Sequence, residues 1–301
     1  MKFVCYREFD DPQEPILPGV LYQGRTLPLT RVVAVAEALA PKGLSVPDDL
    51  FAVISKLASY GKALRELEKA RILDKIWPEA GVTFAAPLPR PHRILCIGRN
   101  YAEHAKETGS DVPSEPIVFQ KASTSVIASG QPIVLPPNVG NVDFEGELAV
   151  VIGVAGKNVS EAEALSLVAG YTLFNDVTAR DEQKRAIAKS LPWFLSKSYD
   201  TFGPLGPCLV TPDEIADPQN LTLTLTVNDI VKQEVNTSEM LFTIPALIAY
   251  LSRHFALAPG DVIATGTPSG IAPLHPGDLV EVRIAEIGTL ANPVIGEDDL
   301  F

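Results

Sequence analysis

The sequence predicts a mixed, β-rich α+β fold, in which a β-rich roll or barrel with peripheral helices follows a small N-terminal α+β domain. With 301 residues, of which 46% are hydrophobic and 21% charged, the chain is long enough for one large core and a smaller one. From residue 93 onward, short strand patterns separated by Gly, Pro, Asn or Asp dominate. The regular strand and helix alternation of a doubly wound α/β sheet is missing, which favours the roll or barrel.

Residues 1–82 are expected to form the smaller domain. A strand pattern over residues 1–9 is followed by a turn-rich stretch at residues 15–24. Two helical patterns come next. The second begins near residues 47–48, where a Pro and an acid suit a first helical turn, and we expect Gly61 to interrupt it.

Residues 83–92 are expected to link the two domains, because three prolines favour extended backbone and oppose a helix or a central strand.

The larger domain then covers residues 93–301. Its strand patterns lie at residues 94–97, 117–119, 147–152, 171–175, 221–227, 230–235, 262–265 and 279–284. Its helical patterns lie at residues 101–108, 160–170 and 243–255. Apolar and polar residues alternate strictly over residues 221–227, and Asn228 and Asp229 follow. This pattern predicts a hairpin with one buried and one solvent-exposed face.

Charge and cysteine content exclude several classes of protein. The chain has 25 basic and 37 acidic residues and no basic run, which argues against binding to nucleic acid or to anionic membranes. Cys5, Cys96 and Cys208 are too dispersed to suggest a disulfide framework or a zinc knuckle. The first residues lack the apolar core of a signal peptide, and no segment reaches the ~18 apolar residues of a membrane span. We therefore expect a cytoplasmic protein whose anionic ligands need a locally positive pocket.

Glu145 and Glu147 are the most informative residues of the chain. Two carboxylates two positions apart on a strand face the same side, and an apolar run follows them directly. Asp176, at the end of another apolar run, offers a third carboxylate. Three buried carboxylates without nearby His or Cys suit Mg²⁺ or Mn²⁺ better than zinc. The alternative is that these acids face solvent or pair with Lys and Arg.

His104 and Glu107 form a candidate general-base dyad. On a short helix they lie at positions i and i+3, so the carboxylate can hold one imidazole nitrogen while the other takes a proton from water. The alternative is a packing histidine beside a solvated glutamate.

A third group of candidate residues is cationic and polar. Lys121 and Lys197 end short apolar stretches, and Arg180 and Gln183 stand three apart. With a divalent cation they could hold a small polyanion and stabilise a developing enolate, although each alone is also typical of a protein surface. Thr267 lies in a glycine-containing loop after a strand, where N–H groups and its hydroxyl could bind a carboxylate. A tight turn is the alternative.

Six stretches, read in order, closely resemble the fumarylacetoacetate hydrolase family over residues 93–287. They are Gly-Arg-Asn-Tyr-x-x-His, Val-Phe-x-Lys, Glu-x-Glu, Asp-Val-Thr-Ala-Arg-Asp, Leu-Pro-Trp followed by Ser-Lys-Ser, and Thr-Gly-Thr-Pro-Ser-Gly. The resemblance implies a β-roll core, a homodimer and enzymes that act on 2-oxo acids. It implies Mg²⁺ or Mn²⁺ at Glu145, Glu147 and Asp176.

The same resemblance assigns roles to the remaining candidates. His104 and Glu107 match the dyad on a lid helix, and Lys121 and Lys197 match active-site lysines. The expected substrate-binding residues are Arg99, Arg180, Gln183 and Thr267.

The implied reaction is metal-dependent hydrolysis of a C–C bond in an acylpyruvate-type 2,4-dioxo acid, giving pyruvate and a carboxylic acid. Oxaloacetate decarboxylation, keto–enol tautomerisation and isomerisation of a 2-hydroxyhepta-2,4-diene-1,7-dioate remain alternatives, because the same electron sink serves each. A non-catalytic protein with a structural metal is the alternative of another class. A catalytic site keeps open coordination positions, whereas a structural one does not.

Overall fold

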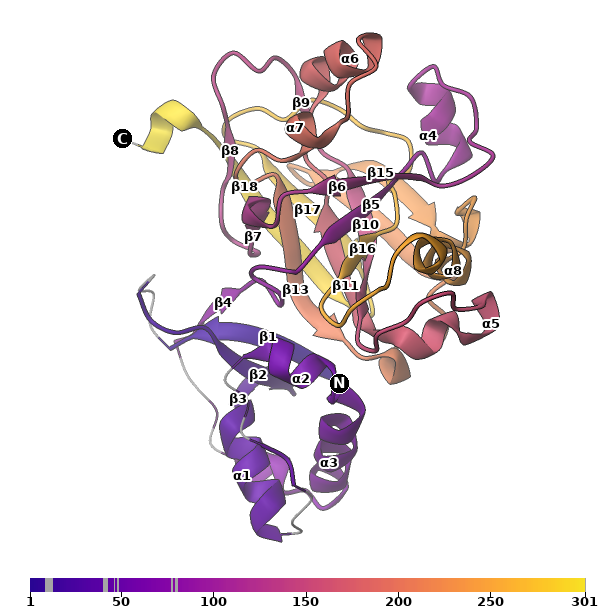
Figure 1. The fold of residues 1–301 in the computed structure, drawn as a ribbon. Helices are drawn as coiled ribbons and strands as arrows, with labels where there is room; N and C mark the ends of the chain where they lie inside the picture. Colours follow the sequence, from indigo (N-terminus) through magenta and orange to yellow (C-terminus); the bar gives the residue numbers. More distant parts are fainter. Residues whose placement is uncertain are drawn as a thin grey trace.

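The computed structural model describes residues 1–8, 13–39, 43–45, 47, 49–76, 78 and 81–300. A smaller N-terminal unit lies beside a larger β-rich body (Figure 1). Phe9, Asp48 and Phe301, which belong to the expected elements and domains, lie outside the described residues.

The N-terminal unit contains strands β1 (Lys2–Arg7), β2 (Leu17–Tyr22) and β3 (Arg25–Pro28) and helices α1 (Leu29–Leu39), α2 (Leu50–Ile54) and α3 (Leu57–Lys69). The turn-rich prediction for residues 15–24 was wrong for most of this stretch. Only Gln23 and Gly24 form the turn, both with positive φ, as a two-residue hairpin requires. The preceding residues are held as β2 because they pair on both sides, with β1 and β3.

The predicted interruption at Gly61 was also wrong. The helical stretch breaks earlier, at Ser55 and Lys56, and Gly61 lies inside α3. A glycine inside a helix costs only about 1 kcal/mol relative to alanine. Burial of Leu64 and Leu67 on the same helix outweighs that cost.

The main sheet runs through both parts of the chain. Its strand order is β3-β2-β1-β13-β11-β10-β16-β5-β6, and two short strands, β4 and β7, pair at its side. The additional strands are β4 (Thr83–Ala85), β5 (Ile94–Gly98), β6 (Ile117–Lys121), β7 (Val126–Ile127), β10 (Gly146–Ile152), β11 (Val168–Asn175), β13 (Gly203–Val210) and β16 (Val262–Ala264). Because β1 pairs antiparallel with β13, the N-terminal strands extend the sheet of the body.

A second sheet packs against this one and completes the roll. Its order is β15-β14-β17-β18-β8, made of β8 (Ile133–Leu135), β14 (Thr222–Val227), β15 (Ile230–Asn236), β17 (Leu279–Ile284) and β18 (Gly288–Gly296). The predicted hairpin is confirmed, with Asn228 and Asp229 as its two left-handed turn residues. A separate short pair joins β9 (Val142–Asp143) to β12 (Thr178–Ala179).

The two faces of the main sheet contribute to two hydrophobic cores. Along β10, Leu148 and Val150 pack into the core between the sheets, whereas Ala149 and Val151 pack into the core shared with the N-terminal helices. This alternation follows from the two-residue period of a strand. A strand that is buried on both faces has a continuous run of apolar residues, and the sequence of β10 contains such a run.

Helices lie around the body (Figure 1): α4 (Ala102–Glu107), α5 (Glu161–Ala164), α6 (Arg180–Ala188), α7 (Phe194–Lys197) and α8 (Ile244–His254). The 3₁₀ turns are Leu73–Lys75, Ser123–Ser125, Leu165–Leu167, Pro212–Glu214, Thr237–Glu239 and Glu297–Leu300. The helix predicted for residues 160–170 is shorter than expected, because residues from Val168 onward pair with β10. The predicted β-rich α+β class with peripheral helices is confirmed.

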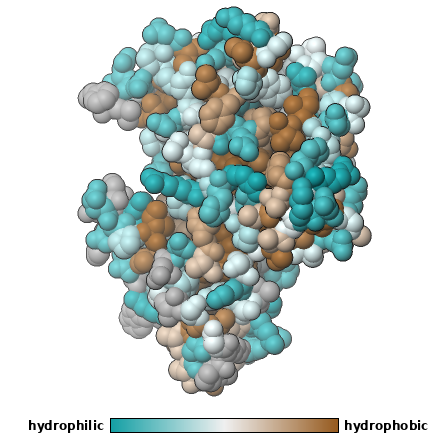
Figure 2. Space-filling model, in the orientation of Figure 1, coloured by the Kyte–Doolittle hydropathy of each residue, from teal (hydrophilic) through white to brown (hydrophobic). Residues whose placement is uncertain are grey.

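The surface shows no large apolar face in the view of Figure 2, where hydrophilic and hydrophobic residues are interspersed. Within the described ranges, no helix is long and apolar enough to cross a bilayer. In Figure 1, α4, α6 and α7 lie at the end of the body remote from the N-terminal unit.

Candidate active site

Three acidic side chains meet where the two central strands of the main sheet end. Gly146 of β10 pairs with Asn175 of β11, so Glu145 and Asp176 lie just beyond this pair. The amide of Asp176 donates to the carbonyl oxygen of Glu145 over 2.8 Å. Carboxylate oxygens of Glu145, Glu147 and Asp176 lie within 4.8 Å of one another, and all three residues are buried. The structure therefore brings the three predicted metal ligands together.

Two buried lysines compensate part of this charge. The ammonium group of Lys197 lies 2.7 Å from a carboxylate oxygen of both Glu145 and Asp176. The ammonium group of Lys121 lies 2.7 Å from the other Asp176 oxygen and donates to the carbonyl of Val177 over 3.0 Å. The acids thus form a cluster and also pair with lysines, so the two alternatives from the sequence coexist.

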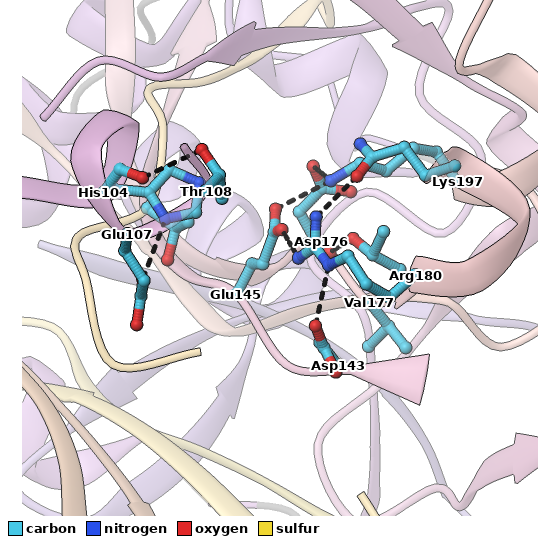
Figure 3. Close-up of polar contacts among 12 residues, drawn as sticks. His104, Glu107, Thr108, Asp143, Glu145, Asp176, Val177, Arg180 and Lys197 are labelled. Carbon is cyan, nitrogen blue, oxygen red and sulfur yellow. Dashed lines mark hydrogen bonds and ion pairs between the residues drawn. The ribbon is translucent and has the colours of Figure 1, made fainter. Parts of the chain in front are cut away.

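Arg180, at the start of α6, connects the cluster to a fourth carboxylate. Its Nε donates to Asp143 over 2.7 Å, a second nitrogen contacts Glu145, and a third donates to Gln183 over 2.5 Å. Figure 3 shows Glu145 between His104 on one side and Lys197 with Arg180 on the other. Arg180 is therefore held in place by three side chains.

These ion pairs shift the protonation equilibria of their members. Although burial opposes ionisation, Lys197 and Arg180 lower the pKa of Glu145 far below its usual range. Burial lowers the pKa of Lys121, against the attraction of Asp176. For Lys197, Asp176 and Glu145 outweigh burial and raise the pKa.

Glu147 differs from its neighbours because it has no ion-pair partner among the described residues. It accepts one hydrogen bond, from the amide of Gly266 over 2.8 Å. Burial, reinforced by the charges of Asp176 and Glu145, raises its pKa well above the usual value. A buried carboxylate in this situation lacks a counter-charge, and a divalent cation would supply it. The all-oxygen donor set of the triad fits Mg²⁺ or Mn²⁺.

The predicted dyad lies on α4 at the edge of the same cavity. His104 Nδ1 lies 3.4 Å from a carboxylate oxygen of Glu107, whose other oxygen accepts from the amide of Gly270 over 3.0 Å. Against the effect of partial burial, the His104 hydrogen bond and the Gly270 amide lower the pKa of Glu107. This contact orients the imidazole and leaves Nε2 free of Glu107. Asn100, before α4, anchors this region by bonding to the backbone of Phe242 and Thr265.

A cavity of about 320 Å³ joins the triad and the dyad. Its lining includes nearly all the predicted site residues: Arg99, His104, Glu107, Glu145, Glu147, Asp176, Arg180, Gln183, Lys197 and Thr267. Lys121 is the exception. It contacts Asp176 from outside the lining, and its catalytic role stays a prediction. Every lining residue belongs to residues 97–271, and the N-terminal unit contributes none.

Thr267 lies in the cavity, but its hydroxyl is already engaged. It donates to the carbonyl of Gly146 over 3.1 Å and accepts from Gln233 Nε2 over 2.9 Å. The same Gln233 accepts from the amide of Gly146, between the two glutamates, and donates to the carbonyl of Pro268. In this structure the Thr267 hydroxyl thus links the loop to Gly146 and Gln233, and its binding of a carboxylate stays a prediction.

Sequence reasoning missed Asp143 and Gln233. Asp143 lies two residues before Glu145 in the same stretch, and its period-two position next to the predicted pair could have revealed it. Gln233 is the polar residue at an inward position of β15 and is 1% exposed. An inward polar residue in an alternating strand is the signal that could have found it.

One cavity thus contains a His–Glu pair beside a buried carboxylate triad, which makes it a candidate enzyme site. Comparisons with known proteins identify the family. Residues 93–295 match the family model for the fumarylacetoacetate (FAA) hydrolase C-terminal domain. A human mitochondrial oxaloacetate tautomerase is 45% identical over 227 residues, which cover 73% of this chain and 72% of that protein. The chain therefore belongs to the fumarylacetoacetate hydrolase family.

Solved structures extend the similarity to the N-terminal unit. A putative HpcE protein from Mycobacterium smegmatis matches with a TM-score of 0.81 and 30% identity, over 99% of this chain and 100% of that one. Maleylpyruvate hydrolase from Sphingobium sp. SYK-6, in complex with manganese (II) ion and pyruvate, matches with a TM-score of 0.78 and 28% identity, over 98% of this chain and 99% of that one. Members of the family are enzymes that include hydrolases and tautomerases.

Proposed function

We propose that this protein hydrolyses a C–C bond of an acylpyruvate-type 2,4-dioxo acid with the help of a divalent metal, giving pyruvate and a carboxylic acid. The observation that supports this proposal most strongly is the His104–Glu107 pair in the same cavity as the carboxylate triad. A proton acceptor beside a metal site is the combination that hydrolysis requires, because water must be activated as well as the enolate stabilised.

The charges of the cavity suggest how the substrate is oriented. The carboxylate and 2-oxo group of the substrate point to the triad, where Glu145, Glu147 and Asp176 would hold Mg²⁺ or Mn²⁺. The bound metal supplies an electron sink at the 2-oxo group. Lys197 and Arg180, which face the same carboxylates, add positive charge at this end of the cavity.

His104 performs the proton transfers. Glu107 holds Nδ1, so Nε2 takes a proton from a water molecule as its oxygen bonds to the 4-carbonyl carbon. The bond between carbons 3 and 4 then breaks, and its electron pair becomes the enolate of pyruvate. The proton held by His104 returns to carbon 3, which restores the free imidazole. Water and the dioxo acid are thus converted into pyruvate and a carboxylic acid.

A second candidate is keto–enol tautomerisation of oxaloacetate. The 45% identity with a human oxaloacetate tautomerase favours it. Tautomerisation moves a proton between carbon 3 and the 2-oxo group, so it requires the triad end of the cavity and a proton carrier but no attacking water.

The test is product analysis with acetylpyruvate, fumarylpyruvate and oxaloacetate, each with Mg²⁺, with Mn²⁺ and with EDTA. Metal-dependent release of pyruvate with stoichiometric acetate or fumarate is the expected result. CO₂ from oxaloacetate, or loss of the oxaloacetate enol absorbance without any cleavage of the other two compounds, would replace hydrolysis by decarboxylation or tautomerisation.

A further inference from the structure

The segment that carries the proposed base is short and depends on contacts outside itself. Helix α4 has six residues, and a helix of this length is only marginally stable in water on its own. A side-chain pair at positions i and i+3, such as His104 with Glu107, adds little stability by itself. The orientation of the imidazole must therefore be set by contacts with other parts of the chain.

One loop, residues 265–270, supplies contacts at both ends of this segment. Before α4, Nδ2 of Asn100 donates to the carbonyl oxygen of Thr265 over 2.8 Å. At the end of α4, the amide of Gly270 donates to Oε1 of Glu107 over 3.0 Å. The other oxygen, Oε2, lies 3.4 Å from Nδ1 of His104 (Figure 3). The carboxylate of Glu107 is thus held at both oxygens, one by the loop and one by the imidazole.

The loop is itself fixed against the second sheet. Nε2 of Gln233, on β15, donates to the hydroxyl of Thr267 and to the carbonyl oxygen of Pro268, in both cases over 2.9 Å. These bonds hold the middle of the loop. They separate Gly270 from the beginning of the loop, where another amide donates to the triad.

Position 270 requires a glycine for two independent reasons. Its φ of 100° lies in a region that L side chains rarely adopt. A Cβ atom there would also overlap with the carbonyl oxygen of Lys232 in β15, the edge strand of the second sheet. The loop backbone therefore lies directly against β15, and this close approach places the Gly270 amide at the carboxylate of Glu107.

The electrostatics of Glu107 agree with this arrangement. Partial burial raises the pKa of its carboxyl group, but hydrogen bonds from His104 and from the amides of Gly270 and Ile271 lower the pKa below its usual value. Glu107 is therefore ionised at neutral pH and accepts a proton-bearing Nδ1. In a neutral ring this leaves Nε2 as the nitrogen that can take a proton.

We propose that Gly270 is a positioning residue for the base: its amide, held against β15, orients Glu107, which keeps the neutral His104 ring protonated on Nδ1. Gly270 is not among the residues that line the cavity, so it acts through Glu107. This inference rests on the proposed function, in which Nε2 of His104 takes a proton from water. It adds that the second sheet determines, through the loop, which ring nitrogen is free.

The test replaces Gly270 by alanine, which forces the loop away from Lys232 and moves the amide away from Glu107. NMR of protein labelled with ¹⁵N-histidine, at alkaline pH where imidazole is neutral, reports the tautomer of each of the four histidines. The His104→Ala spectrum assigns the His104 signals. The wild type should carry the His104 proton on Nδ1, and Gly270→Ala should show a mixture of tautomers.

The same variant should lose turnover without losing its ligands. We expect kcat for acylpyruvate hydrolysis to fall about 10- to 100-fold in Gly270→Ala, the usual effect of losing a partner that orients a functional group. KM and the Mg²⁺ dissociation constant should stay within about twofold, because the middle of the loop keeps its contacts with Gln233.

Gly277→Ala is the matched control. Gly277 also has a positive φ, of 93°, so alanine imposes a similar backbone strain. Within the described residues, a Cβ atom there would meet nothing within 4 Å apart from its neighbours in the chain. Gly277→Ala should therefore change neither the tautomer of His104 nor kcat.

A double-mutant cycle separates positioning from general damage to the cavity. If Gly270 acts through Glu107, then Gly270→Ala should lower kcat by less than about a further twofold in a protein that already carries Glu107→Ala. A purely structural role would give the full loss in both backgrounds.

A second measurement leaves the glycine unchanged and is informative even if Gly270→Ala does not fold. Hydrogen exchange of the Gly270 amide should be at least about tenfold faster in Glu107→Ala than in the wild type, because the acceptor is gone. Equal exchange rates in the two proteins would overturn the inference.

The outcomes distinguish this inference from the proposed function. An unchanged His104 tautomer in folded Gly270→Ala, or equal losses of kcat with and without Glu107, would overturn the inference and leave hydrolysis intact. The expected change of tautomer in a protein that cleaves no acylpyruvate would support the positioning role and overturn the proposed function.

Discussion

Replacing Glu147 by glutamine should stabilise the metal-free protein while abolishing its response to Mg²⁺. Glu147 is buried beside Glu145 and Asp176 and receives only the Gly266 amide as a hydrogen-bond donor. Glutamine has the same shape, can still accept that hydrogen bond and carries no charge. The substitution therefore removes an uncompensated buried carboxylate together with a metal ligand.

The expected magnitude follows from the raised pKa of Glu147. Folding at pH 7 must either keep an unpaired ion in the interior or add a proton to a carboxyl that is ionised in the unfolded chain, and both cost free energy. Glu147→Gln should therefore raise the metal-free free energy of unfolding by about 1–3 kcal/mol. The matched variant Glu145→Gln should have the opposite effect, because it leaves Lys197 and Arg180 with one carboxylate fewer. We expect it to lower that free energy by about 2–4 kcal/mol, since each cation keeps a second carboxylate partner.

The assay is urea unfolding at pH 7 with EDTA and with excess Mg²⁺. The wild type should gain about 2.7 kcal/mol when Mg²⁺ is present at a hundred times its dissociation constant, and both variants should lose this gain. Metal-free destabilisation of similar size by Glu147→Gln and Glu145→Gln would refute the reasoning that only Glu147 lacks a counter-charge.

Three further predictions concern the metal, the loop and the N-terminal unit. Removal of the metal with EDTA should stop turnover but leave cooperative unfolding intact by circular dichroism, whereas unfolding on chelation would indicate a structural metal. Gln233→Leu leaves the Gly146 amide and the Thr267 loop without their partner, and should cost about 1–3 kcal/mol of stability and weaken Mg²⁺ binding measured by calorimetry. Phe3→Ala should cost about 3–5 kcal/mol in a single unfolding transition, because Phe3 is buried and β1 pairs with β13, and two separate transitions would contradict this coupling. Its control is Arg65→Ala, which breaks an exposed pair with Asp213 and should change stability by less than about 1 kcal/mol.

Patterns of apolar residues in the sequence predicted two kinds of strand: those buried on one face, where apolar and polar residues alternate, and those buried on both faces, where apolar residues are continuous. The period-two run at residues 221–227 and the apolar run after Glu147 both became strands within one residue of the expected bounds. By contrast, β13 could not be predicted, because Pro204, Gly206 and Pro207 oppose a central strand. Its pairing with β1 and β11 is set by tertiary contacts that a sequence window does not contain.

The sequence was enough to predict most of the residues that form the candidate site, but not which of their side chains pair with one another. The order of the six stretches, together with spacing, selected the triad and the dyad: Glu145 directly precedes β10 and Glu147 lies in it, and His104 and Glu107 lie on one helix. Partners distant in the chain were not predictable. The Asp143–Arg180 pair spans 37 residues and joins β9 to α6. The Gln233 contact with Gly146 joins β15 to β10, so it depends on how the two sheets pack.

The most direct test of the central claim is acylpyruvate hydrolysis by the Mg²⁺-loaded His104→Ala variant, measured as paired release of pyruvate and carboxylic acid. Loss of a general base should lower kcat by about 10²- to 10⁴-fold with Mg²⁺ affinity unchanged, because His104 is not among the triad ligands. Undiminished hydrolysis by His104→Ala would contradict the assignment of water activation to the His104–Glu107 pair.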